Sequence, residues 1–304
     1  MIDFPEGSQV KVVGTIYIPQ RNAVSGVEGL GVHLRGNNST IIGDGTSVVF
    51  ESGTGSKSTV ALGGASNFPQ ADESAASIHY NSSIEGFNFK TCGGSVKLKN
   101  WIQGCVIKQL YATDFTGSMV ETYRCFYLAQ RDIQGRPFRE DRADSTPIFK
   151  YLNSNNTMSF ENIHGSGISP SSLKKGVVFE FDQGVQGVVL GGGLSAEGAK
   201  IGLSLKSTIY SMGVTGVYFE LCETAVKSTG ANLLNVVMDF NEFEDCIADV
   251  NVDGWIDGYF GAGNKTEGTV VFGTGCTHEV HLPAQTLSEL THTCLLYTSA
   301  SPRD

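Results

Sequence analysis

Short runs of β-branched and aromatic residues alternate with small or polar residues along most of the chain. Typical runs lie at residues 177–181, 188–190 and 236–240. Gly, Asn, Asp and Ser interrupt these runs every few residues, which is typical of strands joined by tight turns. No apolar pattern of helical period extends beyond two turns. The sequence therefore predicts a chain of short β-strands.

The C-terminal half of the chain repeats itself. Residues 211–222 align with residues 235–246, and both copies contain Phe-Glu-x-Cys at an offset of 24 positions. A fainter copy around Glu197 lies 23 positions upstream of Glu220. A period of 20–25 residues indicates a solenoid, and this one has neither the helices of helical repeats nor the leucine core of leucine-rich repeats. Three short strands and three turns per coil predict a parallel β-helix.

We expect one elongated domain over residues 1–293, with an insertion loop around residues 129–147 where charged residues break the strand rhythm. Residues 294–304 resemble the in-frame translation of a transposase-type sequencing adapter. We therefore expect this tail to be non-native and to take no part in the fold. On this interpretation the natural protein continues beyond Thr293.

The N-terminal segments carry a family resemblance. Residues 14–19, 32–36 and 39–45 are short strand-like segments, each with a glycine at one end. This arrangement resembles the first coils of pectate lyase-like right-handed parallel β-helix proteins, particularly bacteriophage tailspikes and tail-fibre depolymerases. The resemblance implies a homotrimer on the virion tail, or alternatively an extracellular protein. It also implies that the partner is a bacterial surface polysaccharide: capsule, exopolysaccharide or O-antigen.

Composition excludes several other classes. The net charge of −10 argues against nucleic acid as a partner, because phosphate binding needs a basic face. No segment reaches the ~18 apolar residues of a membrane span, so we expect no membrane insertion. The seven cysteines include no C-x-x-C pair, which argues against zinc. We expect no metal and no cofactor.

The repeat places three glutamates in equivalent positions. Glu197, Glu220 and Glu244 are spaced by 23 and 24 residues, so they would form a column on strands ~4.8 Å apart. Repulsion between stacked carboxylates raises the pKa of one of them, which would supply the acid and the base of a glycosidase. We expect Glu220 and Glu244 to be catalytic, with Asp239 as a further carboxylate. The alternative is that these glutamates follow a buried aromatic residue and lie in solvent.

Substrate contacts are expected from the same region and from the charged loop. Glu197 belongs to the column, and Tyr218 is one of several aromatic residues that would stack on sugar rings if they do not pack in the core. Arginine guanidinium groups bind carboxylates in a bidentate manner, as in uronic or sialic acids. The arginines expected to contact an acidic polysaccharide are Arg136, Arg139 and Arg142. The alternative is a solvated loop with internal ion pairs, or a subunit contact.

The function expected from these features is the hydrolysis of a cell-surface polysaccharide by a tailspike-type depolymerase, that is, a glycosidase. Two alternatives stay open at this point. One is a non-catalytic receptor-binding adhesin or structural tail-fibre segment with the same solenoid. The other is a polysaccharide lyase, although the sequence shows no dense Asp cluster for the Ca²⁺ that such lyases often use.

Overall fold

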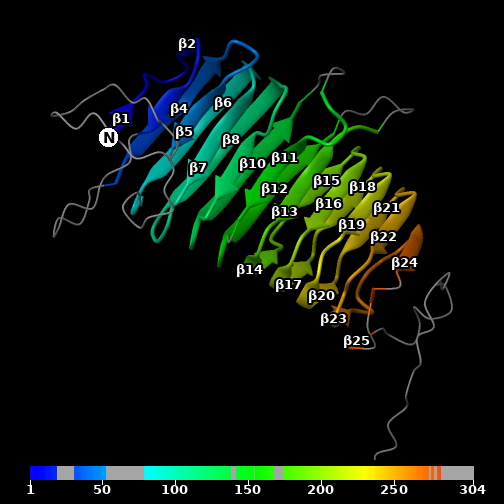
Figure 1. Cartoon of the computed structure of the whole chain (residues 1–304). Helices are drawn as coiled ribbons and strands as arrows, with labels where there is room; N and C mark the ends of the chain where they lie inside the picture. Colours follow the sequence, from blue (N-terminus) through cyan, green and yellow to red (C-terminus); the bar gives the residue numbers. More distant parts are fainter. Residues whose placement is uncertain are drawn as a thin grey trace, which may run out of the picture.

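The computed structural model describes residues 1–18, 31–52, 79–137, 142–153, 155–167, 174–273, 275–276 and 279–281. Within these ranges the chain forms strands β1 to β25 and no helix. The strands stack side by side from the N-terminal to the C-terminal end of an elongated molecule (Figure 1). The described strands pair in parallel, with equivalent residues of successive coils opposite each other, and they form two sheets of 15 and 10 strands.

The two sheets, here called sheet A and sheet B, run along the whole stack. Sheet A contains β1 (Ile2–Asp3), β2 (Gln9–Lys11), β4 (His33–Ile42), β6 (Ser83–Cys92), β8 (Val106–Phe115), β10 (Ala129–Arg136), β12 (Ser159–Ser166), β14 (Val185–Leu190), β15 (Ser195–Glu197), β17 (Ile209–Thr215), β18 (Tyr218–Glu220), β20 (Leu233–Asp239), β21 (Glu242–Glu244), β23 (Asp257–Phe260) and β25 (Glu279–His281). Sheet B contains β3 (Ile16–Ile18), β5 (Val48–Ser52), β7 (Gly94–Lys99), β9 (Val120–Tyr123), β11 (Pro147–Leu152), β13 (Val177–Asp182), β16 (Ile201–Lys206), β19 (Thr224–Thr229), β22 (Ala248–Val252) and β24 (Thr269–Phe272).

The chain crosses from sheet A to sheet B and back in every coil, so strands that pair within a sheet are not consecutive in sequence. Parallel crossovers of this kind are right-handed because of the intrinsic twist of L-residue strands. The fold is a right-handed parallel β-helix, which confirms the architecture predicted from the repeat and from the family resemblance.

The length of a coil varies along the stack. Hydrogen-bonded side chains of successive coils lie 23 residues apart at Thr91 and Asp114, and 30 residues apart at Asp132 and Asn162. In the coil that begins with β10, here called the long β10 coil, the additional residues fall between β10 and β11. Residues 129–136, the predicted start of the insertion loop, instead form β10 and pair with β8 and β12. The strand extends to Arg136 because Ile133 and Gly135 continue the inward positions of the neighbouring strands.

The core is a set of apolar columns between the two sheets. Phe219 and Phe243 stack with ring centroids 5.2 Å apart and planes 6° from parallel, and both rings are fully buried. Tyr151 and Phe181 stack at 4.5 Å in the middle of the molecule. Each coil leaves one apolar face open, and the next coil covers it, so stacking supplies the hydrophobic stabilisation that no single coil has.

Sheet A changes form halfway along the molecule. From β4 to β12 each coil contributes one long strand to sheet A, whereas β12 pairs with two strands of the following coil, β14 and β15. A glycine turn at residues 191–193 separates these two strands, and Gly192 has the positive φ of 65° that the corner requires. From this coil onward the outer face of sheet A bends at a corner between β17 and β18 and between β20 and β21.

Candidate functional site

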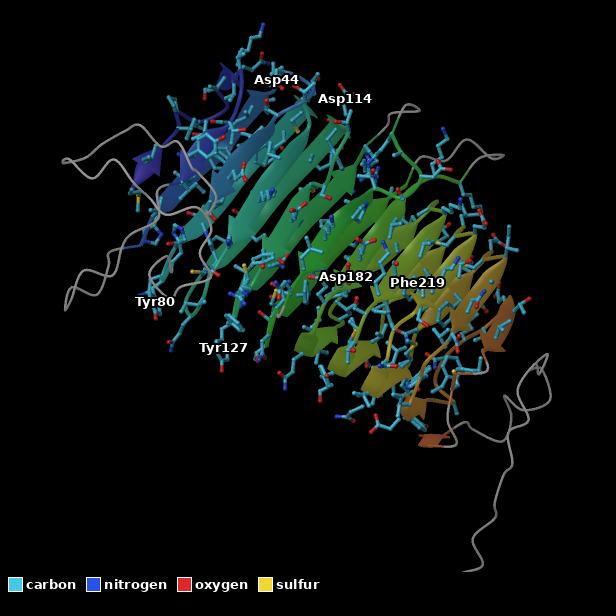
Figure 2. The ribbon with its side chains drawn as sticks, in the orientation of Figure 1. Asp44, Tyr80, Asp114, Tyr127, Asp182 and Phe219 are labelled. Atoms are coloured by element: carbon cyan, nitrogen blue, oxygen red, sulfur yellow. The ribbon has the colours of Figure 1, made fainter. Side chains whose placement is uncertain are left out.

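Two columns of polar side chains follow the outer face of sheet A, on either side of an inward-facing position. The glutamate column contains Thr113, Arg136, Ser166, Glu197, Glu220 and Glu244. The tyrosine column contains Tyr111, Gln134, His164, Ser195, Tyr218 and Glu242. Together they form a strip of hydrogen-bonding groups along the helix axis, here called the polar strip. Side chains that carry nitrogen or oxygen atoms project from the ribbon in many of the coils (Figure 2).

The predicted stacking of the three glutamates is confirmed. Glu197 pairs in register with Glu220, and Glu220 with Glu244. Partial burial and the charges of its two neighbours raise the pKa of the Glu220 carboxyl above its ordinary value of 4.5, burial being the largest cause. Glu220 therefore holds a proton more readily than an ordinary glutamate.

Glu244 is held by a tyrosine from the neighbouring coil. The Tyr218 hydroxyl donates a hydrogen bond of 2.5 Å to Oε2 of Glu244, which raises the pKa of Tyr218. Beside it, Glu242 forms an ion pair with Lys265 at 2.7 Å. Tyr218 thus lies within the predicted site and orients one of its carboxylates.

Glu197 is held by two serines. Ser195 donates to Oε1 at 3.0 Å and Ser166 donates to Oε2 at 3.3 Å. His164 connects this pair to the rest of the strip, since its Nδ1 lies 2.9 Å from the Ser195 hydroxyl and its Nε2 lies 2.6 Å from Oδ1 of Asn162. The strip thus continues beyond the glutamates as a chain of hydrogen bonds.

Sequence reasoning missed these serines and His164. The signal that identifies them is the shared Ile-x-Gly of residues 133–135 and 163–165, which sets the register between β10 and β12. The offset of that pair is 30 residues, not 23 or 24, so the simple repeat misses it.

The predicted arginines separate into different environments. Arg136 ends β10 and belongs to the glutamate column, where the Gln134 side-chain oxygen, turned toward it, accepts from Nε and Nη2 at 2.9 Å. Arg139 lies outside the described residues. The prediction for Arg142 is wrong, because this side chain is 3% exposed and donates to the carbonyl oxygens of Gly117 and Pro147.

Arg142 is buried because the turns around it leave carbonyl groups that need donors. Its guanidinium lies 5.3 Å from the ring of Phe115, and burial lowers its pKa to about 10. Arg142 therefore links the long β10 coil to the preceding coil by hydrogen bonds, and its side chain is too deeply buried to contact a ligand.

Asp239 does not join the stacked glutamates. It ends β20, whereas Glu244 lies in β21 on the other side of the corner. Its Oδ1 accepts hydrogen bonds from the backbone N–H groups of Phe240 and Gly263, both at 3.0 Å. Asp239 therefore caps a turn of the next coil.

Other aromatic side chains flank the strip. Tyr210 and Tyr259 are 43% and 38% exposed on the outer face of sheet A, so both offer a ring to a ligand. Trp255 is fully buried and belongs to the core.

No group of three or more potential metal-ligating side chains occurs among the residues that the structure describes. In the same part of the chain, no helix has the length and apolar character needed to cross a membrane.

The chain was compared with protein families, curated proteins and solved structures. No family model matches the chain, and no curated protein matches it in sequence. Among solved structures, the chain is similar to a double mutant of the tailspike protein of E. coli bacteriophage HK620 in complex with a pentasaccharide. The match has 12% sequence identity and a TM-score of 0.46, and it covers 90% of this chain. The chain spans 60% of the length of that tailspike chain.

Proposed function

We propose that the protein binds a bacterial surface polysaccharide along the polar strip and hydrolyses it at the stacked glutamates. The observation that carries the proposal is the in-register column in which Glu220, with its raised pKa, lies between Glu197 and Glu244. Adjacent strands are ~4.8 Å apart, close to the ~5 Å between the two carboxyl groups of retaining glycosidases. Glu220 serves as the general acid and Glu244, oriented by Tyr218, as the nucleophile.

The strip also fits the shape of the proposed substrate. A polysaccharide is a linear chain of polar units, and the strip offers hydroxyl, amide, imidazole and carboxylate groups along successive coils. Tyr210 and Tyr259 add exposed aromatic rings on the same sheet. Arg136 lies in the same column as the glutamates and would bind an acidic sugar near the reacting linkage. Asp239 is left out of the proposed reaction because its carboxylate caps a turn.

The test is the release of reducing ends from a panel of capsules, exopolysaccharides and O-antigens. Glu220→Gln should lower the rate by about 10²- to 10⁴-fold, the usual contribution of a general acid. The matched control is Glu223→Gln, because Glu223 is an exposed glutamate in the turn that follows β18. An equal rate for wild type and Glu220→Gln would refute the catalytic assignment.

A non-catalytic adhesin is the second candidate, and a specific observation favours it. Glu197 and Glu244 are both engaged by hydroxyl groups of the protein itself, as expected for a rigid binding surface. Under this alternative the wild-type protein binds a glycan of the panel and releases no reducing ends. An unsaturated product absorbing in the ultraviolet would instead identify a lyase.

We further propose that the protein acts as a homotrimer on a virion tail, or alternatively outside the cell, as the family resemblance implies. A parallel β-helix presents a long flank to solvent, and such flanks can pack against identical copies. Light scattering on the purified chain tests the trimer directly, and a monomer at micromolar concentration would contradict it.

A further inference from the structure

A second concave site lies on the outer face of sheet A, several coils before the glutamates. Between β4 and β6 the register shifts, so that residues 36–38 lie opposite Gly86 alone. Bulges of this kind redirect side chains and are common beside binding sites. Two glycines make this one possible: a Cβ on Gly36 would lie 2.3 Å from the carbonyl oxygen of Gly86, and Gly86 has a φ of 74°.

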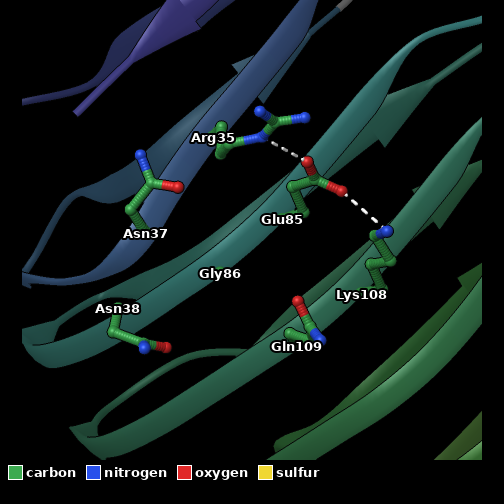
Figure 3. Close-up of a pocket in the computed structure, with 7 residues that line it drawn as sticks. All are labelled: Arg35, Asn37, Asn38, Glu85, Gly86, Lys108 and Gln109. Atoms are coloured by element: carbon green, nitrogen blue, oxygen red, sulfur yellow. Dashed lines mark hydrogen bonds and ion pairs between the residues drawn. The ribbon is translucent and has the colours of Figure 1, made fainter. Parts of the chain in front are cut away.

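The bulge and the bare backbone of Gly86 together form a groove. Its volume is about 550 Å³, within the usual range of small-ligand sites. The residues that line it are Arg35, Asn37, Asn38, Glu85, Gly86, Lys108 and Gln109 (Figure 3). In the next coil Gln109 has a side chain at the position that Gly86 leaves empty, so the groove is closed on that side.

The lining residues supply three side-chain amides and a chain of ion pairs, and none of the seven has an apolar side chain. Glu85 accepts from Nε of Arg35 at 2.8 Å and from Nζ of Lys108 at 2.9 Å (Figure 3). Both hydrogen bonds lower the pKa of Glu85 and keep it ionised. Asp3 lies 4.0 Å from Nε of Arg35 and balances the remaining positive charge.

The charges of this groove therefore cancel locally. An anionic ligand would have to displace Glu85 from two cations. An apolar ligand would cover the amides of Asn38 and Gln109 without offering them hydrogen bonds, whereas Asn37 already donates to the carbonyl oxygen of Phe4. A sugar ring avoids both costs, because each hydroxyl donates and accepts at the same time and adjacent hydroxyls fit amide groups and shared ion pairs.

We propose that this groove binds one uncharged sugar residue of the polysaccharide and forms a second glycan site separate from the stacked glutamates. The inference rests on the proposed function for the identity of the polymer. A glycan held there as well as on the polar strip gains affinity from simultaneous contacts at two places on one rigid solenoid.

The experiment is an NMR titration of the isotope-labelled full chain. The probes are the methyl glycosides of glucose, galactose and N-acetylglucosamine, with glucuronate and inorganic phosphate as charged comparators. At least one neutral glycoside should shift the side-chain NH₂ signals of Asn38 and Gln109, with a dissociation constant on the order of 1 mM. Because the ligand is uncharged, the affinity should not change with salt.

Two variants assign the shifts to the groove. Lys108→Gln should weaken binding about tenfold, since it removes a charged donor. Gln109→Gly should do the same and suits the backbone, because Gln109 has a φ of 54°. The matched control is Lys97→Gln, because Lys97 also pairs with glutamates but lies on sheet B.

Each outcome bears on the proposal. Binding that is lost in both groove variants and retained in Lys97→Gln supports it. Preferential, salt-sensitive binding of glucuronate or phosphate overturns it, as does the absence of shifts with every glycoside. Failure of the proposed function is a separate outcome. If neutral glycosides change the NH₂ signals but the protein neither binds nor cleaves any polysaccharide of the panel, the groove is a sugar site and the proposed function is wrong.

Discussion

The outer face of sheet A carries a column of opposite charges near its N-terminal end and a column of like charges near its C-terminal end. In the N-terminal coils one column places Arg35, Glu85 and Lys108 on successive strands, and the carboxylate there has a cationic partner on each side. In the C-terminal coils, strands β15, β18 and β21 of the same sheet stack Glu220 between two further glutamates. In both regions the column residues pair in register on parallel strands, so the fold does not require the like-charge stack.

Like charges directly opposite each other on adjacent strands destabilise a sheet. The N-terminal column shows that this chain can place opposite charges on neighbouring strands of the same sheet. The unbalanced glutamates are therefore a cost of the kind that functional sites carry. This difference between the two regions is the main physical reason for proposing that hydrolysis takes place at the stacked glutamates.

The largest expected effect comes from truncating a core aromatic residue, which tests whether the two regions unfold as one unit. Phe243→Ala should destabilise the protein by about 3–5 kcal/mol, because it leaves a cavity beside the stacked ring of Phe219. Phe179→Ala, which removes half of another stacked pair, should cost a similar amount. Urea unfolding followed by circular dichroism measures both, and two separate transitions in either variant would show that the regions unfold independently.

A pair of charge swaps sharpens the comparison. Glu220→Lys gives the C-terminal column the alternating signs of the N-terminal one and should stabilise the protein by about 0.2–1 kcal/mol. Glu85→Lys does the reverse, because it adds a cation between Arg35 and Lys108 in a column that already pairs Lys108 with Arg131, and it should destabilise the protein by a similar amount. Thermal unfolding at low and high salt measures both effects, which should shrink as salt rises. If both variants changed the stability of the protein in the same direction, the contrast between the two columns would be contradicted.

The sequence was informative where the repeat was regular. Phe-Glu-x-Cys recurs at 24 residues, and this alone predicts Glu220 against Glu244 and Phe219 against Phe243, as the structure has them. The strand pattern and the glycine-rich turns predict the parallel β-helix. These features depend on local chemistry repeated at a fixed spacing, which a single sequence displays.

Other parts of the site depend on distances that the sequence does not display. His164 and Ser195 meet because the coil between them is longer than the repeat, with an offset of 31 residues, and such an extra length cannot be recognised without the register. Charge patterning predicts Arg142 as a ligand contact, but its burial follows from carbonyl groups of two separate segments, Gly117 before β9 and Pro147 at the start of β11. Asp239 has the outward phase of a site residue, yet the corner after β20 turns it toward the next coil.

The smallest effect is a difference in pH dependence between Glu85 and Glu220. The pKa of Glu85 is lowered by Lys108 and Arg35, so its contribution to stability is present above the ordinary value of 4.5 and is lost as pH falls through the lowered pKa. The pKa of Glu220 is raised, so its ionised form destabilises the folded protein, and stability is lost as pH rises through the raised pKa.

Comparison of wild type with Glu85→Gln and Glu220→Gln in urea, from pH 3 to pH 8, isolates the two contributions. At neutral pH Glu85→Gln should be less stable than wild type and Glu220→Gln more stable, each by under about 1 kcal/mol because both sites are partly solvated. Both differences should vanish in acid, with the midpoint for Glu85 below the ordinary glutamate pKa of 4.5 and that for Glu220 above it. Coincident midpoints would mean that solvent screens the glutamate stack as fully as the paired column, and the stack would then be an ordinary exposed surface.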